Sequence, residues 1–157
     1  MFYQIVQTIQ QQLSNNLGSN SSYANDKVEF VDTKIPEAVT VNRLISIAKR
    51  RKEQAEYVVG QSPSLTFIYN VDIIVYTKHL NYDAGEKSLE VIEKRLIKNM
   101  SDRTQPIYSL EDSSDNMNEQ VLTVKLVNVD YDSGLWSDNN WAHIAIFTYQ
   151  IATMFQL

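Results

Sequence analysis

The stretch LTFIYNVDIIV, residues 65–75, decides the fold. Apolar and aromatic side chains occupy every second position of it: Leu65, Phe67, Tyr69, Val71, Ile73 and Val75. Side chains alternate between the two faces of a β-strand, so this pattern predicts a strand with one face turned to a core. Ile68 and Ile74 on the other face are also apolar, which indicates partial cover there and a central place in the sheet.

A helix is predicted after this strand. Asp83 and Glu86 have the spacing of a capping box, in which the first side chain accepts a hydrogen bond from an early backbone N–H. An apolar stripe follows at three- and four-residue steps: Leu89, Ile92, Leu96 and Met100. Glu90 and Lys94 form a favourable helical pair, and Pro106 prevents the helix from continuing.

The end of the sequence predicts a β-hairpin. Residues 121–131 and 141–155 both alternate, and the second stretch has the threonine and aromatic content typical of strands. Between them lies the turn sequence DSGLWSDNN, which carries Gly134. The acidic, Ser- and Asn-rich residues 109–119 predict a mobile loop.

The first residues predict an amphipathic helix. Its apolar stripe consists of Phe2, Ile5, Val6, Ile9, Leu13 and Leu17. Several glutamines, Gln12 among them, fall on the other side of the predicted helix. Gly18 then stands where a left-handed C-cap would fall, and residues 27–32 predict a short strand.

Residues 38–55 fit two structures. Val41, Leu44, Ile45 and Ala48 fit a helical stripe, but the β-branched residues also fit a period of two. We assign a strand to residues 39–48, because β-branched side chains favour extended structure. Residues 49–63 would then form a long exposed connection.

These elements together predict an α+β fold in one domain, residues 1–157. Strands and helices that do not alternate strictly favour a largely antiparallel or mixed sheet with two amphipathic helices packed on one face. A chain of 157 residues buries enough surface to fold without a metal or disulfide.

Composition excludes several classes of protein. The net charge of −5 argues against a free-standing nucleic-acid binder, which would need a basic excess to neutralise phosphates. The chain contains no cysteine, so disulfide scaffolds, thiolate metal sites and thiol nucleophiles are excluded. No stretch approaches the ~20 apolar residues that cross a bilayer, and we expect a soluble protein without membrane contact.

Motifs for catalysis and for cofactors are not recognisable in the sequence. The glycines fit no phosphate-binding loop. His143, near Ser137 and Asp138, is expected to be a hydrogen-bonded sheet histidine rather than part of a triad. Asp130 and Asp132 would project from one strand face but match no calcium loop. We therefore predict no catalytic residue, no cofactor and no metal.

Two features are candidates for an interface. The first is the run Lys49, Arg50, Arg51 and Lys52. It is either a solvated loop, or a surface that meets an acidic segment of a neighbouring subunit, such as residues 111–115, or, less favoured in an acidic chain, a contact for a nucleic-acid backbone. The second is Trp136 in its polar turn, where an aromatic side chain is either core or an interface anchor.

The order of these elements resembles the tail-terminator proteins of long-tailed bacteriophages and their neck and tail-completion relatives. The likeness lies in the N-terminal helix, AVTVNRL (residues 38–44), YNVDIIVYTK (69–78), AGEKSLEVIEKRLIKNM (84–100) and WAHIAIFTYQI (141–151). It concerns element order and size, without an invariant motif. The long connection over residues 49–63 departs from the family pattern.

The resemblance implies a structural virion protein of the tail or neck, assembled in the host cytoplasm, without catalytic site or cofactor. Its subunits would form a homohexameric ring that caps the tail tube, stops elongation and offers a docking surface for the head. The partners would be its own copies, the tail tube protein and a neck or connector protein, with DNA passing through the lumen.

Three alternatives stay open. A head-to-tail connector or tail-completion protein would bind the end of another ring. A small hydrolase would use His143 with Asp138. A ligand-binding domain would be a stable monomer with a deep apolar pocket.

Overall fold

The computed structural model describes residues 1–34, 41–60, 63–116, 118–135 and 138–157. The elements follow in the order α1 (Phe2–Leu17), β1 (Phe30–Asp32), β2 (Arg43–Val58), β3 (Ser64–His79), α2 (Tyr82–Ser101), a 3-10 turn (Pro106–Ser109), β4 (Glu111–Asp112), a second 3-10 turn (Ser114–Asn116), β5 (Asn118–Leu135) and β6 (Trp141–Gln156). The strands form a sheet in the order β1-β2-β3-β6-β5-β4.

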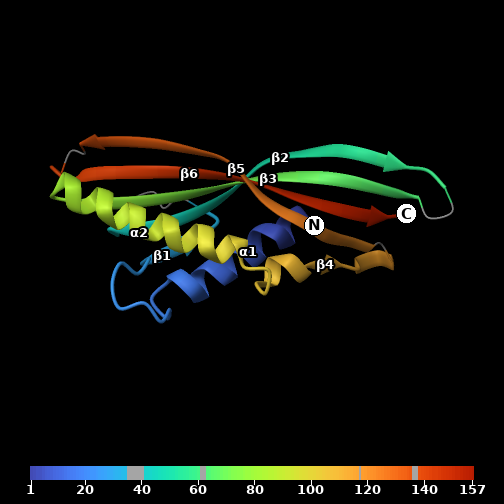
Figure 1. Ribbon diagram of the computed structural model, residues 1–157, viewed down its shortest axis with the longest axis horizontal. Helices are drawn as coiled ribbons and strands as arrows, with labels where there is room; N and C mark the ends of the chain where they lie inside the picture. Colours follow the sequence, from blue (N-terminus) through green and yellow to red (C-terminus); the bar gives the residue numbers. More distant parts are fainter. Residues whose placement is uncertain (35–40, 61–62, 117, 136–137) are drawn as a thin grey trace.

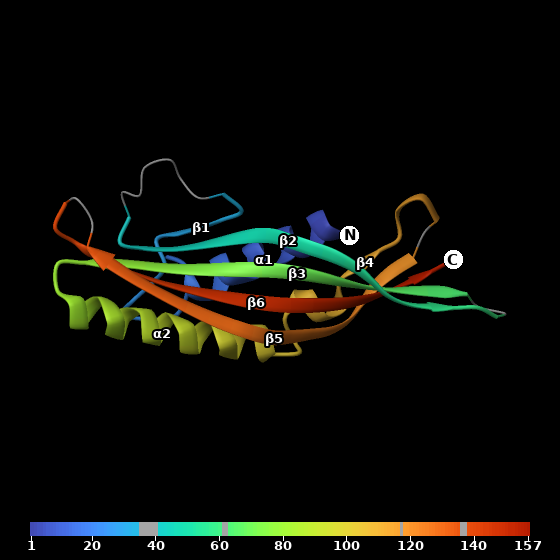
Figure 2. The ribbon, with the colours of Figure 1, turned by 90° about the horizontal axis from the view of Figure 1, so that it is seen from above.

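Both helices lie on the same face of a long, strongly twisted sheet (Figures 1 and 2). All strand pairs are antiparallel except β1 with β2, which is parallel. The predicted α+β class, the largely antiparallel sheet and the placement of the helices are therefore confirmed. The strand predicted to be central, β3, lies between β2 and β6.

The main core lies between the helices and the middle of the sheet. On α1 it contains the predicted stripe, and on α2 it contains Leu89, Ile92, Leu96 and Met100. The sheet contributes alternate residues of its three inner strands, among them Ile73 on β3 and Phe147 on β6, both 0% exposed. Burial of this apolar surface is the main source of stability for the sandwich.

The structure corrects the interpretation of residues 39–63. Instead of a strand over 39–48 and a connection over 49–63, β2 runs from Arg43 to Val58 and pairs with residues 64–77 of β3. Residues 39, 40, 61 and 62 lie outside the described part of the chain. The charged half of β2 is at the margin of the sheet, where charged side chains reach water and do not oppose extended structure.

The chain leaves α1 differently from the prediction. Gly18 is extended (φ −76°, ψ −170°) rather than left-handed, and its backbone bridges to Val28. A Cβ at this position would collide with the carbonyl oxygen of Ser14, so glycine is needed for close approach and not for a positive φ. The short strand begins at Phe30, three residues later than expected.

Several ends of elements also differ. Asn81 caps α2 in place of Asp83, its side chain accepting a hydrogen bond from the N–H of Ala84. Residues 109–119 are not a simple loop, since they contain β4 and a 3-10 turn. The final hairpin is confirmed, but β5 extends to Leu135 and shortens the predicted turn.

Gln12 is buried, although the helical pattern placed it on the polar side of α1. Its Nε2 donates to Oδ1 of Asn99 on α2 at 2.9 Å, and its Oε1 accepts from the N–H of Ile107 at 3.3 Å. A buried amide with these partners satisfies its hydrogen-bonding groups and ties the two helices to the turn that follows α2.

Candidate functional site

The basic run lies on β2, where a β-bulge between Lys49 and Arg51 distributes its side chains over both faces of the sheet. Lys49 and Lys52 point to the helix face. The ammonium of Lys49 is 5.6 Å from the ring centre of Phe2, and that of Lys52 is 4.1 Å from the ring centre of Phe67. Cation–π contacts of this kind contribute about 0.5–1 kcal/mol at exposed sites, so the two lysines have a local structural role.

Arg50 points to the opposite face, which the helices do not cover. One of its terminal nitrogens donates to Oδ1 of Asp72 at 3.4 Å and to Oγ1 of Thr148 at 3.1 Å. Arg51 contacts Glu53 at 2.6 Å. Their side chains stay 56% and 71% exposed, and surface ion pairs contribute little to stability. Both guanidinium groups are accessible to a partner.

Trp136, the other predicted interface residue, lies outside the described residues, and so does Ser137. The pair Leu135 and Trp141 is the last one between β5 and β6 on this side. The assignment of Trp136 to an interface stays a prediction.

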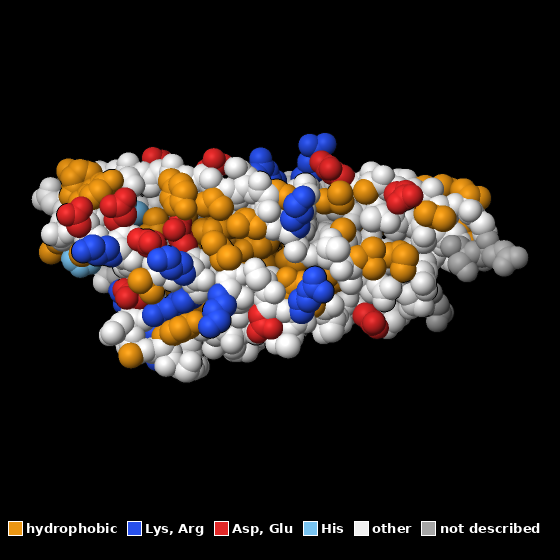
Figure 3. All heavy atoms as spheres, viewed as in Figure 1, with side chains coloured by type: hydrophobic (Ala, Val, Ile, Leu, Met, Phe, Trp, Pro, Cys, Tyr) orange, Lys and Arg blue, Asp and Glu red, His pale blue; other side chains and the backbone are white. Residues whose placement is uncertain are grey.

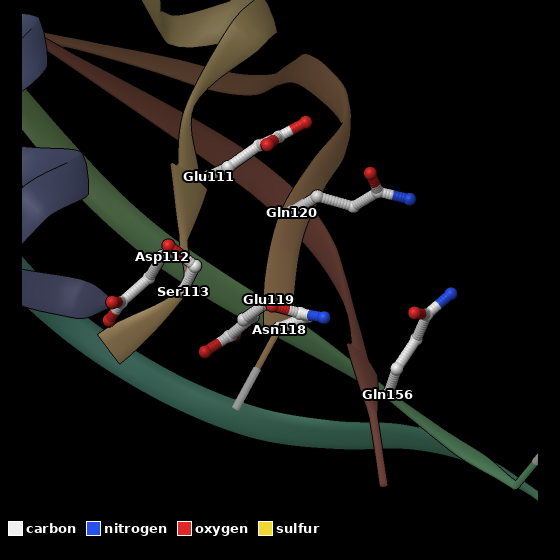
Figure 4. Close-up of a pocket in the computed structure, with 7 residues that line it drawn as sticks. All are labelled: Glu111, Asp112, Ser113, Asn118, Glu119, Gln120 and Gln156. Carbon is white, nitrogen blue, oxygen red and sulfur yellow. The ribbon is translucent and has the colours of Figure 1, made fainter. Parts of the chain in front are cut away.

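The acidic segment around β4 was one predicted partner of the basic run. Here Asp112 turns toward α1, accepting from Nε2 of Gln4 at 2.9 Å and lying 3.7 Å from the N-terminal ammonium. Asp112 and Glu119, which pair across β4 and β5, point to the same side, whereas Glu111 points to the other (Figure 4). Among the described residues, no three metal-ligating side chains lie together.

Both margins of the sheet are open over most of their length. On one side β1 pairs only with Leu44, Ile45 and Ser46, so β2 has no outer strand among the described residues from position 47 onward. On the other side β4 pairs only with Glu119 and Gln120 of β5. The described part of the chain covers neither the outer side of residues 47–58 nor that of residues 122–135 with a strand.

The β5 margin combines apolar and acidic side chains. Large apolar residues that are at least 40% exposed occur along it and on neighbouring α2: Leu122, Val127, Tyr131, Leu135, Tyr82 and Ile97. They contribute to a hydrophobic band on the side of the molecule where β5 and α2 lie nearest the viewer (Figure 3). Asp130 and Asp132 share one face, as predicted, and it is the uncovered face, since they stand opposite Ile146 and Ile144 of β6. Both lie within β5.

His143 is the hydrogen-bonded sheet histidine that was predicted. It is 2% exposed, its Nε2 lies 3.0 Å from the carbonyl oxygen of Tyr82, and its Nδ1 lies 2.8 Å from Oγ of Ser133. A carbonyl only accepts, so Nε2 carries the proton, and in the neutral ring Nδ1 accepts from Ser133. Asp138, the expected acid, instead contacts Lys78 at 2.9 Å.

Replacing Gly85 by alanine is expected to destabilise the protein by about 2 kcal/mol, because an added methyl overpacks the histidine site. A Cβ at this position would lie 2.9 Å from Cδ2 of His143 and 3.2 Å from Cβ of His79. Urea unfolding measures the effect. Ala84→Gly, the opposite exchange one residue earlier, is the control for helix propensity, and equal stability of Gly85→Ala and wild type would contradict the close packing.

Glu93 borders the groove between α2 and β5 that His143 also lines. Burial raises the pKa of its carboxyl above the ordinary 4.5, against a hydrogen bond from Tyr131 that lowers it. The folded state therefore holds the Glu93 proton more tightly than the unfolded state, and stability is lost as pH rises above about 4.5.

Glu93→Gln removes this buried charge and is expected to become more stable than wild type as the pH rises from 4 to 7. Thermal unfolding at a series of pH values checks this. Glu86→Gln, on the exposed side of α2, is the matched control. A constant difference between Glu93→Gln and wild type across the range would show that burial does not perturb Glu93.

No protein-family model matches the chain, and no curated protein matches it. Among solved structures, it is similar to one described as the virion of a native gene transfer agent particle. That likeness has a TM-score of 0.41 and 7% identity, and it covers 92% of this chain and 91% of the other. A likeness this distant carries no argument about function.

Of the two open margins, only the one formed by β2 carries a feature that could be recognised in the sequence; the one formed by β5 does not. The basic run marked β2 by its charge density. The outer side of β5 gave no comparable signal, because alternation describes which face a side chain occupies and not whether a strand has a neighbour on both sides. The exposed Leu122 and Val127 coincide with irregularities in the pairing of β5 with β6, which alternation cannot locate.

No helix among the described residues is long and apolar enough to cross a membrane.

Proposed function

We propose that the chain is a structural virion protein that acts by self-assembly into a ring. The observation that carries this proposal is the pair of long open margins on one sheet, β2 and β5. Natural proteins normally shield such edges, because unpaired backbone N–H and C=O groups are a template for another chain. A neighbouring copy would supply that shield and also bury the exposed apolar side chains of β5.

The specific role we propose is that of a tail terminator. Support for it comes from the order and size of the elements, which resemble that family. In this role the ring, a hexamer in the family, would cap the tail tube, stop its elongation and present a surface to the neck or connector protein. The chain would act as one domain, by shape and not by chemistry.

The test is electron microscopy and native mass of the purified protein, alone and mixed with the tail tube protein of the same phage. The expected result is rings, their attachment to one end of each tube, and shorter tubes in their presence. A protein that stays monomeric and leaves tube length unchanged would overturn the proposal. Rings that bind portal-side protein and ignore tubes would assign the connector role instead.

The hydrolase alternative has one observation in its favour, the contact between Ser133 and His143. The other imidazole nitrogen faces a backbone carbonyl and no carboxylate. The Ser133→Ala variant distinguishes a hydrolase from a ring-forming structural protein. A hydrolase would lose activity on model esters with this change, whereas a ring protein would assemble as before.

A further inference from the structure

The strands at the two open margins of the sheet, β2 and β5, run antiparallel to each other, so the margins of two copies can pair. The four long strands, in the order β2-β3-β6-β5, pair antiparallel throughout, so β2 and β5 run in opposite directions. If copies are related by rotation about an axis along the strands, every strand keeps its direction. The β2 strand of one copy then meets the β5 strand of the next as an antiparallel pair, and each junction repeats the same contact.

The margins also differ in charge on the face that the helices leave uncovered. Arg50 of β2 lies on that face, since it contacts Asp72 and Thr148 there. On β5, Asp130 occupies the same face opposite Ile146 and is exposed. Opposite charges directly across an antiparallel pair stabilise it, whereas like charges destabilise it.

The lengths of the open stretches limit the register, and the opposite charges select within it. Centring residues 47–58 of one copy on residues 122–135 of the next brings Arg50 within one residue of Asp130. Counting eight residues along each strand from Arg50 and Asp130 reaches Val58 and Leu122. Each strand has one further bulge on this path, between Gln54 and Glu56 in β2 and between Leu126 and Asn128 in β5, so the two counts stay matched. The apolar side chains of Val58 and Leu122 are 44% and 47% exposed in the single chain. The same register therefore joins one pair of opposite charges and one pair of apolar residues.

We propose that β2 of one copy pairs antiparallel with β5 of the next, with Arg50 opposite Asp130, to make one sheet that is continuous through the assembly. This inference rests on the proposed self-assembly and adds which surfaces make the contact. Lysines and bulges on an edge also act against indiscriminate pairing, and here they disfavour β2 against β2, which would oppose two basic runs.

Cysteine cross-linking tests the register directly, because the chain has no cysteine of its own. Residues directly opposite in an antiparallel pair have Cα atoms about 4.5–5.5 Å apart, within the range that a disulfide spans. After mild oxidation, Arg50→Cys/Asp130→Cys is expected to give a ladder of oligomers on a non-reducing gel. An equal mixture of the two single variants is expected to give dimers only.

Two controls make the result decisive. Lys94→Cys, on the exposed side of α2, mixed with Asp130→Cys is expected to give no specific product. Asp130→Cys alone is also expected to stay uncross-linked. Dimers of that single variant would show that two β5 strands pair with each other, which overturns the proposal.

Charge reversal gives a second, independent measurement. Arg50→Glu and Asp130→Arg are each expected to weaken assembly at least about tenfold in dissociation constant, with the combined variant restored toward wild type. Both side chains are exposed, so circular dichroism should show an unchanged fold. If the wild type forms rings, Arg50→Glu forms them equally well and the double cysteine variant gives no ladder, the edge contact is refuted although the ring exists. A wild-type monomer that ignores tubes would refute the proposed function itself.

Discussion

Replacing Phe147 by alanine is expected to destabilise the protein by about 4 kcal/mol, the largest effect of any single change considered. The side chain is 0% exposed and stands between Ile73 of β3 and Val129 of β5. Removing it leaves a cavity in a close-packed core, because the paired strands around it and the helices packed on them can relax only partly.

Urea or guanidinium unfolding measures this loss. Ile146→Ala, one residue earlier and on the uncovered face, is the matched control, and we expect a loss of less than half as much, because Ile146 is only partly buried. Similar losses in the two variants would mean that the helix face is not the principal core.

Glu119→Ala is expected to cost about 3 kcal/mol, because it removes the common acceptor of two buried hydroxyl groups. Oε1 of Glu119 accepts from the hydroxyl of Tyr69 at 2.7 Å and from that of Thr153 at 2.6 Å. All three residues are buried where β3, β6 and β5 lie side by side. Burial is the main reason that the pKa of Tyr69 is raised, and its hydrogen bond to Glu119 adds to the effect.

The control is Glu119→Gln, which keeps an oxygen acceptor and should lose distinctly less stability. A double-mutant cycle with Tyr69→Phe then isolates the contact, since the second change should cost less when Glu119 is already absent. Strict additivity of the two losses would show that the hydroxyl and the carboxylate do not interact.

The elements with strong periodicity were predictable from sequence. Both helices and the strands β3 and β6 carry enough apolar residues at the right spacing that local pattern and tertiary burial agree. The core stripe of α2 is found as predicted, and so is the long antiparallel pairing of the last two strands.

The features that depend on neighbours were not predictable. The charged half of β2 shows no apolar alternation, because it lies at a margin and its pairing with β3 comes from backbone hydrogen bonds. Gln12 is polar and yet buried because Asn99 and Ile107, distant in sequence, supply its partners. The residues of the proposed interface have the same character, since the single sequence does not show which strand lacks a neighbour.

The position of β6 has a consequence for synthesis. This strand lies between β3 and β5, yet it is the last of the three to leave the ribosome. Until it emerges, β3 can pair only with β2, and its other side lacks a partner that is encoded more than sixty positions later. Such distant pairing closes slowly. The nascent chain therefore exposes more unpaired backbone N–H and C=O groups than the finished subunit does. Chaperones that bind unpaired strands should prevent aggregation most effectively in that interval.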